Sequence, residues 1–247
     1  MKLSNPNKEL FEGVTKQNVY DYYDSVANKI LPLFEGRAVA IVKCPGGVES
    51  SCFYNKNIDG GKIYINTKEE LLSQIQQNAI EFHVEGYPQM VFDLDPDEGL
   101  SHDALVQGCL DLRKILKDLG LTPTIKTSGG KGYHVMVTVD MPFEEFVAFS
   151  KNVAELMAAK FPDKYTTNIR KDARKGLVFI DWLRNTKGAT CVVAYSLRAK
   201  PNAGISMPIP WSKLKTTKPD GVRIRNIAGF EFHKNSPLSK RGGSRLG

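Results

Sequence analysis

Two carboxylates at the end of an apolar strand are the first candidates for chemistry in this sequence. A strand period of two places Asp93 and Asp95 on one face of MVFDLDPDEG and the intervening apolar residues on the other. Hard divalent cations prefer oxygen ligands, and two ions held about 3.5–4 Å apart can activate an attacking oxygen and stabilise a leaving phosphate oxygen. A solvated strand exit rich in turn-forming residues is the alternative interpretation.

A third carboxylate favours the metal interpretation. Asp181 interrupts the apolar run LVFIDWL, and a charged side chain inside such a strand is costly to bury without a partner or a metal. A salt bridge to Arg184 or Arg174 would also satisfy it. The sequence therefore predicts that Asp93, Asp95 and Asp181 form one acidic site, with an ion pair at Asp181 as the alternative.

A glycine-rich segment between these carboxylates has groups that could bind a polyphosphate. In TIKTSGGKGYHVMVTV, the residues from Ser128 to Gly132 can present backbone N–H groups, a hydroxyl and the Lys131 ammonium, and His134 follows at the start of a strand. The spacing is not that of a P-loop, and the segment leads into a strand instead of a helix. A plain glycine-rich hairpin with an exposed lysine is the alternative.

Cations cluster on either side of Asp181. A triphosphate with its metals needs both signs of charge within a few ångströms, so this clustering next to an acidic site favours nucleotide binding. A solvated basic face is the commoner explanation for any one of them. The cations are Arg170, Lys171, Arg174, Lys175, Arg184, Lys187 and Arg198.

Helices and strands are predicted to alternate around these groups. Thr15 is predicted to cap an amphipathic helix that ends near Pro32, and Ser101 to cap a helix over 101–119 that stops at Gly120. Helical spacing also predicts helices over 67–80 and after Pro142. We expect an α+β or mixed-sheet fold in which strands carry the polar groups and helices cover the other face. The apolar stripe of the last helix is Phe143, Phe146, Val147, Val153, Leu156 and Met157, and strand patterns occur within 37–65 and over 81–87, 89–95, 122–130, 131–140, 177–182 and 190–199.

Composition limits the class of protein. The 247 residues are 41% hydrophobic, which excludes a disordered or fibrous chain, and the formal charge of +7 favours a polyanionic partner such as nucleic acid. No apolar run approaches the roughly 20 residues that span a bilayer, so we expect a soluble, cytoplasmic protein. The four cysteines are far apart and form no C-x-x-C pair, which predicts reduced cysteines, with neither a disulfide framework nor a zinc knuckle.

Three motifs together resemble a known family. D-L-D in FDLDPDEG, S-x-x-K-G-x-H in TSGGKGYHV and the single Asp in VFIDWLRN resemble, in order and spacing, the motifs of archaeo-eukaryotic primase-type polymerases. The closer match is the polymerase domain of bacterial ligase D and its stand-alone archaeal relatives, which act in non-homologous end joining. The segments SNPNK, GVTKQNVYDYYDSVA, CFYNK, AIEFHV and AYSLRA extend the resemblance over residues 4 to about 212.

The resemblance implies a fold and an activity. The fold would be a single primase-polymerase domain over 1–235, with an N-terminal α/β module of about 1–80 and a catalytic core of about 81–212 that is similar to an RNA-recognition-type mixed sheet. Residues 236–247 would form a basic, flexible tail. The activity would be that of a template-directed, metal-dependent nucleotidyltransferase that extends 3′-hydroxyls with NTPs or dNTPs and fills short gaps at DNA double-strand breaks. It would recognise a downstream 5′-phosphate and favour ribonucleotides.

Alternatives and partners also follow from the resemblance. A primase that starts chains de novo would use the same three carboxylates, and a non-catalytic DNA-end binding and synapsis module would use the basic charge alone. A metal-dependent nuclease is less favoured, because it leaves the glycine-lysine segment without a purpose. A separate DNA ligase and a Ku-type end-binding protein are the implied partners, and the implied location is the cytoplasm, in association with the nucleoid.

The resemblance assigns roles to single residues. Asp93, Asp95 and Asp181 would hold two Mn²⁺ or Mg²⁺ ions. The incoming nucleotide would contact His83, Ser128, Lys131, His134, Lys171, Arg184, Thr190 and Arg198, with Arg184 on the ribose side. DNA would contact Lys8, Lys16, Phe53, Tyr54, Lys56 and Arg174, of which the first two hold a 5′-phosphate and the aromatic pair stacks on bases. The alternatives are surface lysines, core aromatics and, for His83, a satisfied core histidine.

Overall fold

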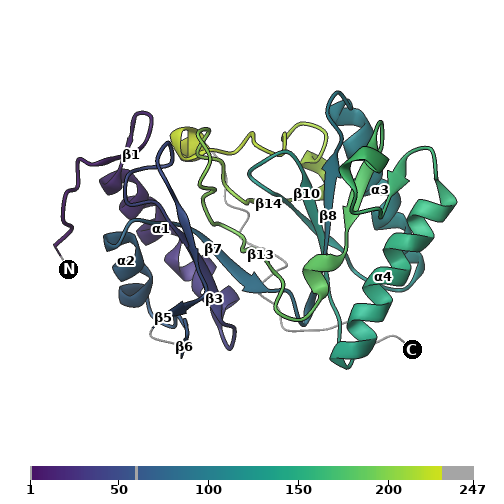
Figure 1. Ribbon diagram of the computed structural model, residues 1–247, viewed down its shortest axis with the longest axis horizontal. Coiled ribbons are helices and arrows are strands. Elements are labelled where there is room, and N and C mark those ends of the chain that lie inside the picture. Colours follow the sequence, from purple (N-terminus) through teal and green to yellow (C-terminus); the bar gives the residue numbers. More distant parts are fainter. Residues whose placement is uncertain (1, 59–60, 230–247) are drawn as a thin grey trace.

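The computed structural model describes residues 2–58 and 61–229, which form two neighbouring β-sheets with helices packed on each (Figure 1). The α-helices are α1 (Lys16–Phe34), α2 (Lys68–Gln76), α3 (His102–Asp118) and α4 (Phe143–Lys160). Short 3₁₀ helices are η1 (Lys171–Arg174), η2 (Leu183–Asn185), η3 (Trp211–Lys213) and η4 (Ile224–Gly229). Helices α1 and α2 lie at one end of the molecule and α3 and α4 at the other. The mixed α+β class expected from the sequence is confirmed.

The larger sheet has six strands in the order β11-β12-β8-β10-β9-β14. Its strands are β8 (Gln89–Pro96), β9 (Thr124–Thr127), β10 (Tyr133–Thr138), β11 (Tyr165–Thr166), β12 (Val178–Asp181) and β14 (Pro208–Ile209). All neighbours are antiparallel except β11 and β12. Helices α3 and α4 pack on β8, so one face of this sheet is covered by helices.

The smaller sheet has four strands in the order β13-β7-β3-β4. They are β3 (Val39–Lys43), β4 (Phe53–Asn55), β7 (Ala79–Glu85) and β13 (Thr190–Val192), all antiparallel. Two short hairpins, β1 (Glu9–Phe11) with β2 (Val14–Thr15) and β5 (Asn57–Ile58) with β6 (Gly61–Lys62), complete the strands. Because β13 lies between β12 and β14 of the six-stranded sheet in the chain but pairs with β7, the chain crosses between the two sheets.

Local sequence signals set most helix ends. Thr15 accepts a hydrogen bond from the Asn18 backbone N–H and forms a capping box, and Ser101 accepts from the Ala104 N–H in the same way. Gly120 has a φ of +77°, the left-handed conformation that ends a helix. Helix α1 runs two residues beyond Pro32, because the buried Phe34 packs its last turn onto the core.

Two predicted boundaries and the predicted burial of one side chain were wrong. The helix predicted over 67–80 ends at Gln76, and Ala79 begins β7 instead. The strand predicted over 190–199 stops at Val192, and the residues after it are buried in turns. Leu156, predicted in the apolar stripe of α4, is 52% exposed.

The prediction of fully reduced cysteines was also wrong. Cys44 and Cys52 form a disulfide, whereas Cys109 and Cys191 are free and buried. The antiparallel hairpin of β3 and β4 explains the pairing, since Lys43 lies opposite Phe53 and each is the neighbour of one cysteine. The spacing of the cysteines along the chain does not reveal this, because the pairing depends on the strand register.

One hydrophobic cluster includes residues from both sheets, among them Phe82 on β7 and Phe92 on β8. This continuity is consistent with a single domain, within which we propose an N-terminal module and a catalytic core. The predicted tail, 236–247, lies outside the described residues. No helix within the described ranges is long and apolar enough to cross a membrane.

Candidate active site

A row of polar side chains crosses the middle of the six-stranded sheet. Asp181 on β12 lies opposite Asp93 on β8, Asp93 lies opposite His134 on β10, and His134 lies opposite Lys126 on β9. Directly paired residues of neighbouring strands point to the same face. Because Phe92 and its apolar neighbours in β8 join the core, this row lies on the face opposite α3 and α4. The alternation predicted for MVFDLDP is confirmed.

Arg184 joins the two opposed carboxylates. Its Nε lies 3.5 Å from Asp93 Oδ2 and 3.2 Å from Asp181 Oδ2. Asp181 Oδ1 also accepts a hydrogen bond of 3.0 Å from the Leu183 backbone N–H. The ion pair considered as an alternative for Asp181 is therefore present with Arg184. Arg174 instead lies over the Phe179 ring, with its guanidinium carbon 3.4 Å from the ring centroid.

Asp93 is a buried carboxylate, and one of its two oxygens lacks a hydrogen-bond partner. It is 7% exposed, and its Oδ1 accepts no hydrogen bond from the described residues, although His134 Nε2 lies 3.4 Å away. Burial, followed by the negative charge of Asp95, raises the pKa of Asp93 to about 7. Bringing a cation close to this carboxylate would offset both penalties. The donor set, carboxylate oxygens with an unpartnered buried oxygen, therefore fits a hard divalent cation.

The described residues do not already form a closed metal cage. No group of three or more His, Cys, Asp or Glu side chains within 2–58 and 61–229 is gathered closely enough to hold an ion. Asp95 lies on the same strand as Asp93 but nearer the glycine-rich loop 128–132, called the glycine loop below. A Cβ added to Gly132 in this loop would be 2.7 Å from Asp95 Oδ1. The same Cβ would be 2.3 Å from the Leu94 carbonyl oxygen, so only glycine allows this close approach.

His134 and Lys126 continue the row as a neutral and a cationic group. Burial and then the charges of Lys126 and Arg198 hold the pKa of His134 well below its usual range, so the imidazole is neutral at physiological pH. Lys126 is 1% exposed, and its Nζ donates a 2.6 Å hydrogen bond to Ser206 Oγ. Burial lowers the pKa of Lys126 to about 8.

The glycine loop is held by its own hydrogen bonds. Ser128 Oγ accepts from the backbone N–H groups of Gly130 (3.1 Å) and Gly132 (3.2 Å), and the Gly129 N–H donates to the Pro219 carbonyl (3.0 Å). The prediction that the loop presents these N–H groups to a polyphosphate is therefore wrong for these three. The Lys131 ammonium remains exposed beside the loop.

Glu81 on β7 holds two of the predicted nucleotide contacts. Its Oε1 accepts from His83 Nε2 (2.7 Å) and Arg198 Nε (2.9 Å), and its Oε2 accepts from the Ala199 N–H (2.8 Å). Arg198 Nη1 also donates to the Ser128 carbonyl (2.6 Å). Burial alone would raise the pKa of Glu81, but His83 and Arg198 outweigh it and bring the pKa to about 2. His83 is thus a partly buried, hydrogen-bonded histidine next to Arg198.

The edge strand β4 brings Tyr54 to the same region. The Tyr54 ring meets the His83 ring edge to face at 5.5 Å, and its hydroxyl lies 2.5 Å from Thr190 Oγ1. Phe53 and Tyr54 are 50% and 46% exposed, so they are not core residues. Lys56 Nζ donates to the Gly188 carbonyl (3.0 Å).

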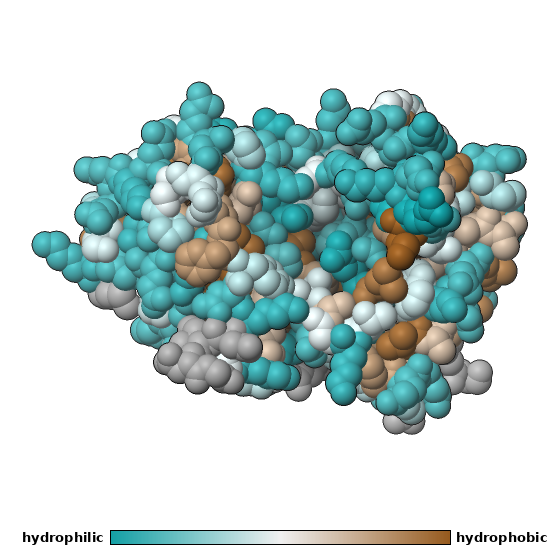
Figure 2. All heavy atoms as spheres, in the orientation of Figure 1, coloured by the Kyte–Doolittle hydropathy of each residue, from teal (hydrophilic) through white to brown (hydrophobic). Residues whose placement is uncertain are grey.

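The space-filling view shows the surface hollowed between the two ends of the molecule (Figure 2).

Comparison with known proteins decides the family. The model of the LigD primase-polymerase domain matches residues 15–63 and 60–235. The chain belongs to this family. It is 31% identical over 246 residues to the multifunctional non-homologous end joining protein LigD of Mycolicibacterium smegmatis, a match that covers 87% of this chain and 32% of that protein. It is 26% identical to the bifunctional non-homologous end joining protein LigD of Bacillus subtilis, over 97% of this chain and 46% of that protein.

A solved structure agrees with this assignment. The polymerase domain from Mycobacterium tuberculosis ligase D in complex with DNA superposes with a TM-score of 0.84 at 28% identity, over 93% of this chain and 94% of that one. The primase-type core and the nucleotidyltransferase class expected from the sequence are confirmed. Polymerase domains of the LigD family are metal-dependent in general. The chain spans about a third of the length of the mycobacterial LigD proteins.

The lysines assigned to a 5′-phosphate lie near the N-terminus of α1. Lys16 is 2% exposed, and its ammonium donates to the carbonyls of Ser4 (3.0 Å) and Gln76 (2.7 Å). The Lys8 ammonium donates to the Pro45 carbonyl. Burial and then the charge of Lys8 lower the pKa of Lys16. Lys16 is therefore not an ordinary surface lysine, and within this LigD-type domain it also fixes the chain around α1.

The remaining predicted contacts lie on the segment before β12. Lys171 is exposed on η1, and Arg174 at the end of η1 donates from Nε to the Asn168 carbonyl (2.9 Å) and from Nη2 to the Ile169 carbonyl (2.5 Å). Arg174 therefore shapes the turn that precedes β12.

Lys126 and Glu81 are site residues that the sequence reasoning missed. Both had a signal in the period of two: Lys126 alternates with Ser128 in TIKTS, and Glu81 alternates with His83 in AIEFHV. Like Asp181, each is a charged residue within a predicted strand. Their partners come from distant segments, around Ser206 and Arg198, which the sequence alone does not bring together.

Proposed function

We propose that this domain is a template-directed polymerase that extends DNA 3′ ends and fills short gaps at double-strand breaks during end joining. The observation that carries the proposal is Asp93, a buried carboxylate opposite Asp181 with an unpartnered oxygen and a raised pKa. In the reaction, a bond forms between the primer 3′-oxygen and the α-phosphorus of the nucleotide. The bond from that phosphorus to the β-phosphate oxygen breaks, pyrophosphate leaves, and the hydroxyl proton passes to solvent.

Asp93, Asp95 and Asp181 would hold two divalent ions, Mn²⁺ or Mg²⁺. When bound, such ions lower the pKa of the 3′-hydroxyl and neutralise the leaving phosphates. In the structure, Arg184 offsets the negative charge of two of these carboxylates, Asp93 and Asp181. A cation at the carboxylates would compete with Arg184, so we assign its released guanidinium to the ribose side of the nucleotide.

The nucleotide would lie between the two sheets. Arg198 is pre-oriented by Glu81 and by the Ser128 carbonyl, which reduces the entropy lost when it contacts a phosphate. Lys131 supplies a further ammonium beside the loop, and the neutral His134 supplies a hydrogen-bonding group that does not add charge. Ser128, Thr190, His83 and Lys171 complete the nucleotide contacts that we propose.

The DNA would be bound by cations and exposed aromatic rings. Phe53 and Tyr54 present half-exposed rings on an edge strand, where bases can stack on them. The DNA contacts we propose also include Lys8, Lys16, Lys56 and Arg174, with the first two near a downstream 5′-phosphate. The chain's positive charge supports this partner. A DNA ligase and a Ku-type end-binding protein are the other partners we propose, in the cytoplasm.

Primer extension on a short gapped duplex tests the proposal. Wild-type protein, Asp93→Asn and the control Glu98→Gln would each be offered NTPs or dNTPs with Mn²⁺ or Mg²⁺. Glu98 is exposed in the turn after β8, so its replacement removes one charge near the site without touching the row. We expect metal-dependent extension by wild type and Glu98→Gln, and a loss of at least about a thousandfold in Asp93→Asn.

The other outcomes distinguish the alternatives. Extension by Asp93→Asn at the wild-type rate would refute the site assignment. Products from an unprimed template would favour a primase that starts chains de novo. Salt-dependent binding to 5′-phosphorylated ends without extension under any condition would favour a DNA-end binding module. Comparison of NTPs with dNTPs tests the expected preference for ribonucleotides.

A further inference from the structure

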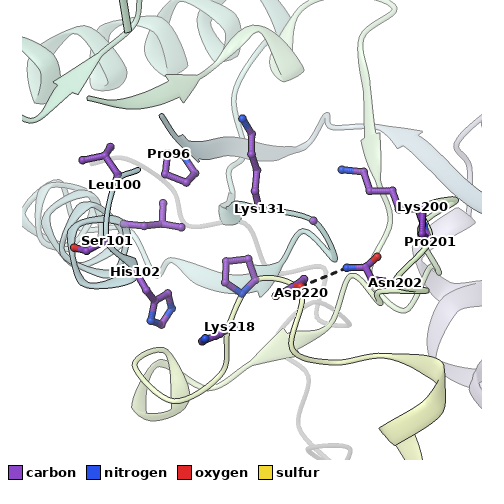
Figure 3. A pocket seen from close by; sticks show the side chains of 13 residues that line it. Pro96, Leu100, Ser101, His102, Lys131, Lys200, Pro201, Asn202, Lys218 and Asp220 are labelled. Atoms are coloured by element: carbon purple, nitrogen blue, oxygen red, sulfur yellow. Dashed lines mark hydrogen bonds between the residues drawn. The ribbon is translucent and has the colours of Figure 1, made fainter. Parts of the chain in front are cut away.

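A cavity of about 640 Å³ lies beside the glycine loop, next to the end of β8. Its walls come from Pro96, the start of α3, the loop at Lys131, and two later segments around Lys200 and Lys218 (Figure 3). The volume is within the range of about 300–1,000 Å³ that is common for small-molecule sites. Of its lining residues, only Lys131 has a role in the proposed nucleotide site.

The cavity carries positive charge that the protein does not neutralise. Lys131, Lys200 and Lys218 line it, all three are exposed, and none forms an ion pair with a carboxylate among the described residues. The one acidic lining residue, Asp220, is paired with Arg223 at 2.9 Å. Lys200 extends toward Lys131, and Lys218 lies on the other side of the cavity (Figure 3). Three lysines that line one space favour a multiply charged anion.

Hydrogen bonds hold the cavity wall in place. The Gly129 N–H donates to the Pro219 carbonyl (3.0 Å), and the Tyr133 hydroxyl donates to the Thr217 carbonyl (2.6 Å), so the segment that carries Lys218 is tied to the glycine loop and to β10. His102 Nε2 lies 2.8 Å from the same hydroxyl and donates to it, since the hydroxyl proton is already used. The cavity is thus joined rigidly to the proposed nucleotide site.

Lys200 is positioned closely against the loop. A Cβ added to Gly130 would lie 2.9 Å from Lys200 Nζ, so the absence of a side chain at this glycine lets the ammonium approach the backbone. Lys200 follows Arg198 by two residues, and Arg198 is fixed to Glu81. Cations on one short segment therefore face both the proposed triphosphate contacts and the cavity.

We propose that this cavity binds the pyrophosphate that nucleotide addition releases, an inference that rests on the proposed polymerase activity. The cavity begins at Pro96, the residue after Asp95, and it shares Lys131 with the triphosphate site. When the bond between the α-phosphorus and the β-phosphate oxygen breaks, the leaving group carries the charge of two phosphates. Lys131, Lys200 and Lys218, which all line the cavity, then offer three cations to this leaving group.

Binding of sodium pyrophosphate, measured by calorimetry in buffer with a chelator, tests the site without turnover. The variants are Lys200→Gln with Lys218→Gln, and the control Lys117→Gln, which removes one positive charge at the far end of α3. We expect pyrophosphate affinity to fall about tenfold in the double variant and to stay at the wild-type value in the control. The inhibition constant of added pyrophosphate in primer extension should rise by the same factor.

The outcomes separate this inference from the proposed function. Unchanged pyrophosphate affinity in the double variant of an extending enzyme would overturn the cavity assignment alone. Weaker DNA binding with unchanged pyrophosphate affinity would also overturn it, and would assign the lysines to a DNA strand. No extension by the wild-type protein, whatever its pyrophosphate affinity, would overturn the polymerase activity instead.

Discussion

Glu81 offers a sharp quantitative test, because one buried carboxylate holds both His83 and Arg198. Three donors point at its two oxygens, from His83 Nε2, Arg198 Nε and the Ala199 N–H. In Glu81→Gln one oxygen becomes an NH₂ group, which cannot accept, so at least one partly buried donor loses its partner. The variant also leaves Arg198 without its counter-charge.

The pKa of Glu81 sets the size of the effect. The folded state lowers this pKa from 4.5 to about 2, which corresponds to about 3 kcal/mol of stability at pH 7. Since the folded pKa is the lower one, this contribution is present above pH 4.5 and is lost as the pH falls toward 2. At pH 3 about 1 kcal/mol should remain. Glu81→Gln has no such titration, so the difference from wild type should shrink over this range.

Urea unfolding of wild type, Glu81→Gln and the control Glu85→Gln between pH 7 and pH 3 measures this difference. Glu85 lies on the same strand and is exposed, so its replacement should change stability by less than about 0.5 kcal/mol. The KM for the nucleotide should rise in Glu81→Gln, because Arg198 is no longer oriented. A constant stability difference between wild type and Glu81→Gln across the pH range would refute the reasoning.

Two further predictions concern the N-terminal module. In extension assays on gapped duplexes, Lys8→Gln should reduce the preference for a 5′-phosphorylated downstream strand about fivefold, because one charged contact worth about 1 kcal/mol is lost. A Lys62→Gln control should keep the preference, and an equal loss in both variants would contradict the assignment. Cys52→Ser should lower the free energy of unfolding by about 2–3 kcal/mol, because the disulfide to Cys44 closes a short loop. Reductant should lower the free energy of unfolding of wild type by the same amount and leave the variant unchanged. An equal effect of reductant on both proteins would contradict this prediction.

Local patterns in the sequence were sufficient to predict most helices and strands, but not all of their ends, and to predict the carboxylate motif. The alternation that separates Asp93 from its apolar neighbours depends only on the strand period, and the caps at Thr15 and Ser101 depend on residues within one turn. These features involve residues that are close together in the chain. For that reason they could be predicted without knowledge of the fold.

Features that depend on strand register could not be predicted in this way. The sequence does not specify that Asp93 lies directly between Asp181 and His134, or that Cys44 reaches Cys52 across a hairpin. The glycine loop is a related case, since the composition of TSGGKG shows donors but not that the Ser128 hydroxyl and Pro219 carbonyl already use three of them. Long-range pairing decides each of these outcomes.

The order of charges across the sheet gives the site a direction. Asp181 and Asp93 carry the negative end, His134 is neutral in the middle, and Lys126 carries the positive end, with Arg198 nearby on the adjoining segment. The positive end would attract a triphosphate, and the carboxylates at the negative end would hold the cations that activate a primer hydroxyl. Since the β-sheet fixes this order through its register, a nucleotide and a primer end bound at this face would meet in one orientation.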